Sequence, residues 1–84
     1  MDTKRLFVGS IPPTFSNRSL KQMFTQFGKI TAVAIEKHRY TGASKGFGYV
    51  TFATSRAAQK AINNMDQKEL EGKKMLVTFA KTYR

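Results

Sequence analysis

The eight residues 45–52 constrain the fold most, because their side chains alternate in character with a period of two. One alternate set is Lys45, Phe47, Tyr49 and Thr51, and the other is Gly46, Gly48, Val50 and Phe52. Successive side chains of a β-strand point to opposite faces of its sheet, so this period predicts a strand. If Val50 and Phe52 point into the core, the rings of Phe47 and Tyr49 lie on the opposite face. The glycines on the core side predict the close approach of a helix there.

Two helices are predicted from apolar stripes that follow a capping hydroxyl. The first follows Ser16, whose side chain can accept a hydrogen bond from a free backbone N–H, and ends at Gly28. Its stripe is Leu20, Met23, Phe24 and Phe27. The second helix follows Thr54 or Ser55, and its stripe is Ala58, Ala61, Ile62 and Met65.

Three further strands surround these helices. Residues 6–9 form a short apolar run, and residues 30–37 can bury Val33 and Ile35 while Ala32, Ala34 and Glu36 face the other side. In the last strand Met75, Val77 and Phe79 alternate with Lys74, Leu76, Thr78 and Ala80. Residues 66–72 form a charged connection with room for a small hairpin. The strand–helix–strand order occurs twice, which predicts one α+β domain of the ferredoxin-like βαββαβ type: a four-stranded antiparallel sheet with two helices packed on one face.

The face of the sheet away from the helices is left open and carries aromatic rings. If Leu6 and Val8 are buried, Arg5 and Phe7 lie on the open face together with Phe47 and Tyr49. A cluster of exposed rings is unfavourable in water unless another molecule covers it. Nucleobases can stack on such rings while neighbouring Lys and Arg side chains meet the phosphates. The pattern therefore favours a nucleic-acid surface.

The charge balance points the same way. Fifteen Lys and Arg stand against five Asp and Glu among 84 residues, which gives a formal net charge of +10. Such an excess favours a polyanionic partner, which could be RNA, DNA or an acidic membrane surface. The membrane surface is disfavoured, because the first helix carries only Arg18 and Lys21 on its polar side.

Several other classes are excluded by residues that the chain lacks. There is no cysteine, so disulfide frameworks, thiol catalysis and zinc knuckles are excluded. His38 is the single histidine and is not expected to form a metal site, and no cofactor is predicted. No apolar run approaches the roughly 20 residues that a membrane span needs. Residues 1–5 lead directly into a strand and do not resemble a signal peptide. The five acidic residues form no convincing catalytic pair, so no enzymatic activity is predicted.

The strand motifs resemble those of the RNA recognition motif family. The octamer Lys45-Gly46-Phe47-Gly48-Tyr49-Val50-Thr51-Phe52 matches the family pattern K/R-G-F/Y-G/A-F-V-x-F/Y once Tyr49 is accepted for Phe. The hexamer Leu6-Phe7-Val8-Gly9-Ser10-Ile11 is similar to the family's motif in the first strand, with Ser10 and Ile11 in place of the more usual Asn-Leu. The resemblance covers residues 4–81, and residues 1–3 and 82–84 are terminal segments.

The resemblance implies a role for each residue on the open face. Phe7 stacks on one base and Tyr49 on its neighbour, Phe47 wedges between their sugars, and Lys45 holds the connecting phosphate. Arg5 and Lys74, which the strand alternation places on the same face, add contacts to phosphates or base edges. The small side chains of Ala32 and Ala34 leave room for a nucleotide over the second strand.

Two further segments lie at the edges of this face. The loop of residues 37–44 offers Lys37, His38, Arg39 and Tyr40, of which Lys37 and Arg39 are predicted to contact RNA. After the last strand, family members often extend the site, so Lys81 and Tyr83 are predicted to contribute a charge and a fourth ring.

The predicted function is the binding of single-stranded RNA or RNA loops by a monomer. The predicted process is post-transcriptional processing or regulation of RNA such as mRNA, in the nucleus or cytoplasm. Single-stranded DNA stays open as a ligand. One alternative is a module of the same fold that binds protein through its helix face, although such modules typically lack the rings. Another is a basic structural protein of the ribosomal type, whose RNA binding would depend on lysines and not on the rings.

Overall fold

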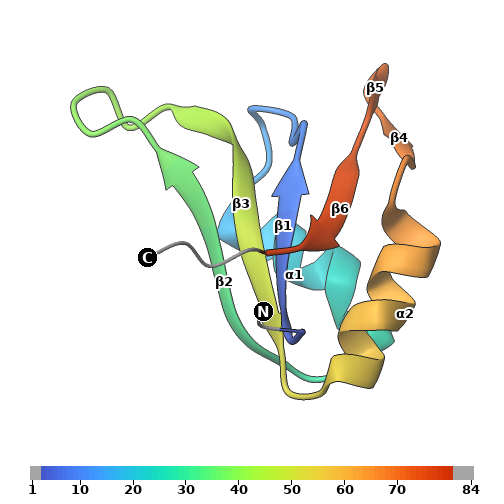
Figure 1. The fold of residues 1–84 in the computed structure, drawn as a ribbon. Helices are drawn as coiled ribbons and strands as arrows, with labels where there is room; N and C mark the ends of the chain where they lie inside the picture. Colours follow the sequence, from blue (N-terminus) through green and yellow to red (C-terminus); the bar gives the residue numbers. More distant parts are fainter. Residues whose placement is uncertain (1–2, 81–84) are drawn as a thin grey trace.

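Four strands form one antiparallel sheet in the order β2 (Ile30–Lys37), β3 (Ser44–Phe52), β1 (Arg5–Gly9) and β6 (Leu76–Phe79). The structure is a computed structural model that describes residues 3–80. The strands that carry the two motifs, β1 and β3, lie side by side in the middle of the sheet, and β2 and β6 form its edges (Figure 1). This arrangement confirms the predicted ferredoxin-like α+β fold.

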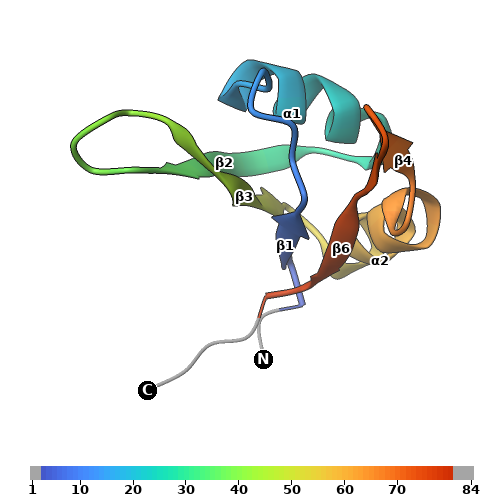
Figure 2. The ribbon, with the colours of Figure 1, turned by 90° about the horizontal axis from the view of Figure 1, so that it is seen from above.

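The two helices begin where the sequence places a capping hydroxyl. Helix α1 (Asn17–Phe24) starts after Ser16, whose side chain accepts a hydrogen bond from the Ser19 N–H, and a 3₁₀ turn, η1 (Thr25–Phe27), continues it to Gly28. Helix α2 (Ser55–Met65) starts after Thr54, whose hydroxyl accepts from the Ala57 N–H. Each cap satisfies a backbone donor that the helix itself leaves unpaired. Both helices lie on the same side of the sheet (Figure 2).

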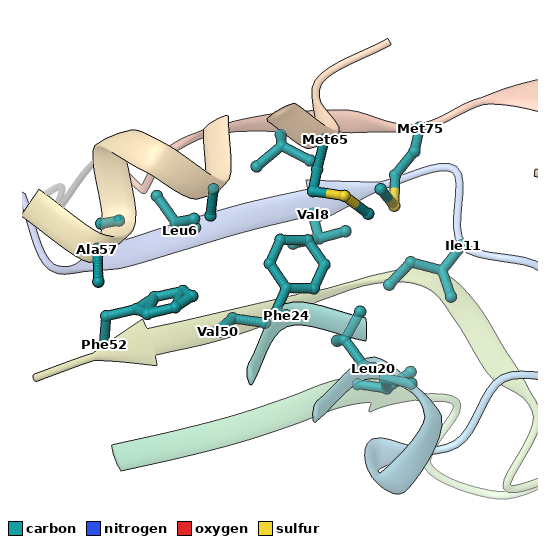
Figure 3. Close-up of a cluster of buried hydrophobic side chains, with 14 residues drawn as sticks. Leu6, Val8, Ile11, Leu20, Phe24, Val50, Phe52, Ala57, Met65 and Met75 are labelled. Carbon is teal, nitrogen blue, oxygen red and sulfur yellow. The ribbon is translucent and has the colours of Figure 1, made fainter. Parts of the chain in front are cut away.

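The core lies between the helices and the sheet. The ring of Phe24 from α1 is fully buried, and Val8 of β1 and Val50 of β3 lie close to it (Figure 3). Phe52 at the end of β3 and Met65 at the end of α2 extend the same cluster. The buried positions of β3 are therefore the ones that the alternation assigned to the core, which leaves Phe47 and Tyr49 for the other face.

A small hairpin replaces the start of the predicted last strand. Strands β4 (Glu69–Leu70) and β5 (Lys73–Lys74) pair with each other in a separate two-stranded sheet, which confirms the hairpin. The prediction that Lys74 belongs to the four-stranded sheet is wrong, because Lys74 pairs with Glu69 in the hairpin and β6 begins only at Leu76. Ala80 was also expected on the open face but is buried, since it lies beyond the end of β6, where the alternation stops.

The close approach at Gly48 comes from a strand and not, as predicted, from a helix. A Cβ atom at Gly48 would lie 2.5 Å from the carbonyl oxygen of Ala34 and 2.9 Å from the Cα atom of Ile35, both in β2. Glycine at this position therefore allows β2 to pack tightly against β3 beside the motif rings.

Candidate functional site

The register of the central strands brings three aromatic rings together on the open face. Phe7 of β1 lies opposite Tyr49 of β3, and Phe47 lies opposite Gly9. The ring centroids are 5.7 Å apart for Phe7 and Phe47, 5.8 Å for Phe7 and Tyr49, and 6.4 Å for Phe47 and Tyr49. These separations lie within the usual range for interacting aromatic pairs. The rings are only partly buried, so they form a ring cluster, Phe7–Phe47–Tyr49, that a flat ligand can reach.

Gly9 allows the ring of Phe7 to lie low over the end of β1. A Cβ atom at Gly9 would be only 3.0 Å from Cε2 and 3.4 Å from Cζ of Phe7. The ring thus occupies the space that a side chain at position 9 would fill. The glycine of the hexamer motif therefore contributes to the position of the ring.

Arg5 adds a planar cation to the ring cluster. Its Cζ atom lies 4.0 Å from the centroid of the Tyr49 ring, within the distance over which a guanidinium is attracted to an aromatic face. Arg5 is half-buried and lies opposite Thr51 of β3, so the strand register holds it on the open face, as predicted. One face of Tyr49 is thus covered by a guanidinium, which itself can stack on a base.

Small and apolar side chains surround the rings on both flanking strands. Ala34 and Ala32 of β2 are exposed and lie opposite Tyr49 and Thr51, so the second strand leaves space above it. On the other side, Thr78 of β6 lies opposite Phe7.

The site prediction omitted one apolar residue of this face. Leu76, like Phe47, lies opposite Gly9 and is 43 % exposed. Leu76 could have been predicted as a site residue, because the alternation of the last strand places it on the open face.

The predicted loop cations lie at the far end of the β2–β3 ribbon. Lys37 pairs with Ser44, and Lys45 follows directly, so both lysines lie near the same strand ends and are exposed. Arg39 is exposed in the connecting loop, which is closed by hydrogen bonds from the His38 N–H to the Ala43 carbonyl and from the Gly42 N–H to the His38 carbonyl.

Tyr40, in the same loop, is 92 % exposed and was not among the predicted site residues. The predicted contacts of Lys81 and Tyr83 lie outside the described residues. Lys74 is exposed in the separate hairpin.

Metal-ligand clusters and membrane-spanning helices were sought among the described residues. Within residues 3–80, no group of three or more His, Asp or Glu side chains is placed to hold a metal ion. No helix in that range has the length and apolar character needed to cross a membrane.

Comparisons with known proteins agree with this geometry. The chain is similar to glycine-rich RNA-binding protein 4, mitochondrial, from Arabidopsis thaliana, with 42 % identity over 93 % of this chain and 57 % of the relative. It also resembles the solved SXL-lethal protein/RNA complex, with a TM-score of 0.92 and 26 % identity over 96 % of this chain and 48 % of that one. A crystal structure of RNA-binding protein PG1 matches with a TM-score of 0.90 and 27 % identity over 96 % of this chain and 98 % of that chain.

These matches identify the family, but they cover only part of the length of the curated relatives. The chain spans 26 % to 57 % of the length of the first curated relatives it matches. The model of the RNA recognition motif matches residues 6–76, which include both motif strands and both helices. On this match, the chain belongs to the RNA recognition motif family.

Proposed function

We propose that this chain binds single-stranded RNA, or the loops of folded RNA, by stacking bases on the ring cluster. The observation that carries the proposal is the packing of Phe7, Phe47 and Tyr49 within 6.4 Å of one another on a sheet face that the helices leave open. Stacking on aromatic side chains contributes roughly 1–3 kcal/mol per base and requires an unpaired strand whose bases can be splayed out. The printed names of the relatives, which include RNA-binding proteins and an RNA complex, support the same ligand.

The proposed path of the strand follows the positions of the rings. One base stacks on Phe7 and the next on Tyr49, because these rings lie on neighbouring strands with centroids 5.8 Å apart. Phe47, which is tilted by 32° against Phe7, contacts the sugars between the two bases. Arg5 extends the Tyr49 platform and directs its N–H donors to base edges or a phosphate.

Electrostatic attraction supports this path at one end of the face. Lys45, Lys37 and Arg39 are exposed around the end of the β2–β3 ribbon, where a phosphodiester chain that leaves Phe47 would pass. Each phosphate that they neutralise releases counterions, which makes the affinity depend on salt. We propose that Lys45 holds the phosphate between the stacked bases and that the loop cations hold phosphates further along. We also propose that Lys81 contributes a charge and Tyr83 a fourth ring, as the sequence predicts.

Alanine substitution of the rings tests the stacking mechanism. Phe7→Ala and Tyr49→Ala should each weaken binding of a short random RNA pool about 5- to 150-fold, because each removes the ring on which one base stacks. Phe27→Ala is the matched control, since Phe27 is also a partly buried ring but packs on the helix side against Phe24. Circular dichroism establishes that each variant is folded. Full RNA affinity in a folded Phe7→Ala, Tyr49→Ala double variant would exclude the proposal.

A salt titration separates this function from the alternatives. Contacts to three or four phosphates of a single strand predict a log–log slope of about −2 to −3. A ribosomal-type structural protein would keep its RNA affinity without the rings and lose it without the lysines. A module that binds protein through its helix face would show no RNA-induced amide shifts on the sheet. The same titration with a deoxyribose pool measures how far the 2′-hydroxyl contributes to the choice of ligand.

The wider role is a separate proposal, which rests on the sequence prediction. We propose that the chain acts as a monomer, by binding and not by catalysis, in post-transcriptional processing or regulation of RNA such as mRNA. The sequence predicts the nucleus or the cytoplasm, whereas the Arabidopsis relative is named as mitochondrial, so imaging of the tagged full-length protein decides between these compartments. Crosslinking and sequencing of the bound transcripts identifies the process.

A further inference from the structure

A pocket outside the ring cluster lies at the β2 edge of the sheet. It has a volume of about 340 Å³ and lies between the start of α1 and the first half of β2. Figure 2 shows α1 lying over β2 at this edge. The pocket is lined by Asn17, Arg18, Lys21, Ile30, Thr31, Ala32 and Val33.

The backbone of β2 offers hydrogen-bonding groups to this pocket. β2 is the terminal strand of the four-stranded sheet, so its outer edge faces no other strand of the described chain. At Ile35 the outward N–H donates to Oδ1 of Asn17 at 2.9 Å, which closes the edge at that residue. In an antiparallel strand every second residue directs its N–H and C=O to the same edge. Val33, two residues away in an unbroken register, therefore directs both groups to the outer edge at the pocket.

The charged side chains next to the pocket are positive, and the nearest acidic residue on α1 or β2 is Glu36, near the far end of β2. Arg18 and Lys21 are exposed on α1, and Lys29 directly precedes β2. The sequence has no Asp or Glu from residue 3 to residue 35, so no acidic side chain of α1 or of the first half of β2 balances these cations. An acidic ligand is therefore complementary to this edge.

We propose that this pocket is the docking site of an extended acidic peptide that adds to β2 as a further strand. A peptide strand supplies both a carbonyl for the Val33 N–H and an N–H for the Val33 carbonyl, and peptides bind other sheet edges in this way. The phosphates of a nucleic acid offer only acceptors, and its 2′-hydroxyl donors do not alternate with acceptors at the spacing of a β-strand edge. A second copy of this chain would bring two chains of net charge +10 together with Arg18 and Lys21 facing their own copies. The acidic peptide satisfies both the backbone and the charge.

The pairing is tested with a capped heptapeptide that alternates threonine and glutamate, followed by amide chemical shifts of the labelled chain. The expected result is saturable shifts at residues 17–21 and 30–35, with the ring cluster unaffected. The matched probe is the same peptide with N-methyl groups on the amides that would pair, which keeps the charge and removes the donors. Equal binding of the methylated peptide, or no shifts at these residues, would overturn the proposal.

Charge reversal tests the role of the cations. The Arg18→Glu, Lys21→Glu variant should bind the peptide about tenfold more weakly or worse, because two favourable charge contacts become unfavourable. The control is Arg56→Glu, Lys60→Glu, which makes the same change in net charge on exposed positions of α2 and should leave peptide binding within about twofold. Equal losses in the two variants would show diffuse attraction only and would overturn the site.

Val33→Pro tests the backbone contact directly. Proline is tolerated on an edge strand where the lost N–H faces outward, and Val33 satisfies that condition. The variant should lose peptide binding and keep the circular dichroism spectrum and thermal transition of a folded chain. Should it fail to fold, the methylated peptide tests the same contact. RNA binding is read separately at the ring cluster, so failure of the RNA proposal would leave this test unaffected. Shifts at residues 30–33 that arise with RNA or with self-association, and not with the peptide, would overturn the proposal.

Discussion

The guanidinium of Arg5 lies over the ring of Tyr49, with its Cζ atom 4.0 Å from the ring centroid. Arg5 of β1 lies opposite Thr51, and Tyr49 of β3 lies opposite Phe7. Arg5 and Tyr49 are therefore diagonal neighbours on the same face of the sheet, two positions apart along the strands. A cation over a tyrosine ring contributes about 0.5–1 kcal/mol at an exposed site. The contact places a stacking surface next to the hydrogen-bond donors of the guanidinium.

We expect Arg5→Ala to weaken RNA binding severalfold while leaving the thermal midpoint nearly unchanged. Arg5→Lys keeps the charge but loses the planar group, so it separates stacking from attraction. If Arg5 acts as part of the Tyr49 platform, the lysine variant should resemble the alanine variant, and the salt slope should stay the same in both. If Arg5 instead neutralises a phosphate, the lysine variant should bind normally, and the alanine variant should reduce the slope by about 0.7. Equilibrium titrations at several salt concentrations distinguish the two.

Gly9→Ala should displace the ring of Phe7 without unfolding the protein. The added Cβ would lie 3.0 Å from Cε2 of Phe7, and the ring is the flexible partner in this contact. RNA binding should then lose part of the roughly 1–3 kcal/mol that stacking on this ring contributes. In a Phe7→Ala background the same substitution should have no further effect, because the ring that it displaces is absent. A similar loss in both backgrounds would show that Gly9 acts independently of Phe7.

The ring cluster could be predicted from the sequence because a strand's alternation is a local property. Once Val50 faces the core, the positions of Phe47 and Tyr49 follow without knowledge of the rest of the fold. The contact of Arg5 with Tyr49 could not be predicted in the same way. It depends on the conformation of a long side chain, which the strand period leaves free.

The position of Lys74 could not be predicted from its strand pattern, because it is set by hydrogen bonds between residues 66–68 and residues 75–77. The Met75 N–H donates to the Lys68 carbonyl at 2.8 Å, and the Gln67 N–H donates to the Met75 carbonyl at 2.7 Å. In addition, Oδ1 of Asp66 accepts from the Val77 N–H at 2.9 Å. These bonds tie the chain just after Lys74 to the connection after α2, so the hairpin includes Lys74 and the sheet strand starts later. The alternation of apolar residues in 74–80 does not indicate whether Lys74 pairs in the hairpin or in the four-stranded sheet.

Lys45→Ala should therefore weaken RNA binding more than Lys74→Ala does. Both substitutions remove one positive charge, so any effect of net charge is the same in the two variants. Lys45 lies in β3 next to the ring cluster, whereas Lys74 lies in the separate hairpin. Loss of one phosphate contact should reduce affinity about fivefold near 0.1 M salt. Equal losses would mean that the hairpin also contacts RNA, and fluorescence anisotropy with one labelled RNA is sufficient to compare them.

Gly48→Ala should destabilise the sheet by about 1–3 kcal/mol, the usual cost of overpacking a tight site. The added Cβ would meet the Ala34 carbonyl and the Ile35 Cα, which are backbone atoms and cannot rotate away. The pairing of β2 with β3 must then loosen. Chemical denaturation measures the loss, and amide exchange should be fastest in residues 32–35. A stability equal to that of the unchanged chain would show that β2 can shift without cost.

Phe47→Ala and Phe52→Ala should have opposite effects, although both remove a phenylalanine ring from β3. Phe52 is 1 % exposed and packs in the core, so its truncation should lower the free energy of unfolding by about 3–5 kcal/mol. Phe47 is only partly buried on the open face, so its loss should change stability far less. RNA affinity should show the reverse order: a marked loss for Phe47→Ala, and normal binding by whatever fraction of Phe52→Ala remains folded. Denaturation and RNA titration of both variants at one temperature test this separation. A large loss of stability in Phe47→Ala would show that the ring holds the sheet together, and its contribution to RNA binding would then have to be separated from folding.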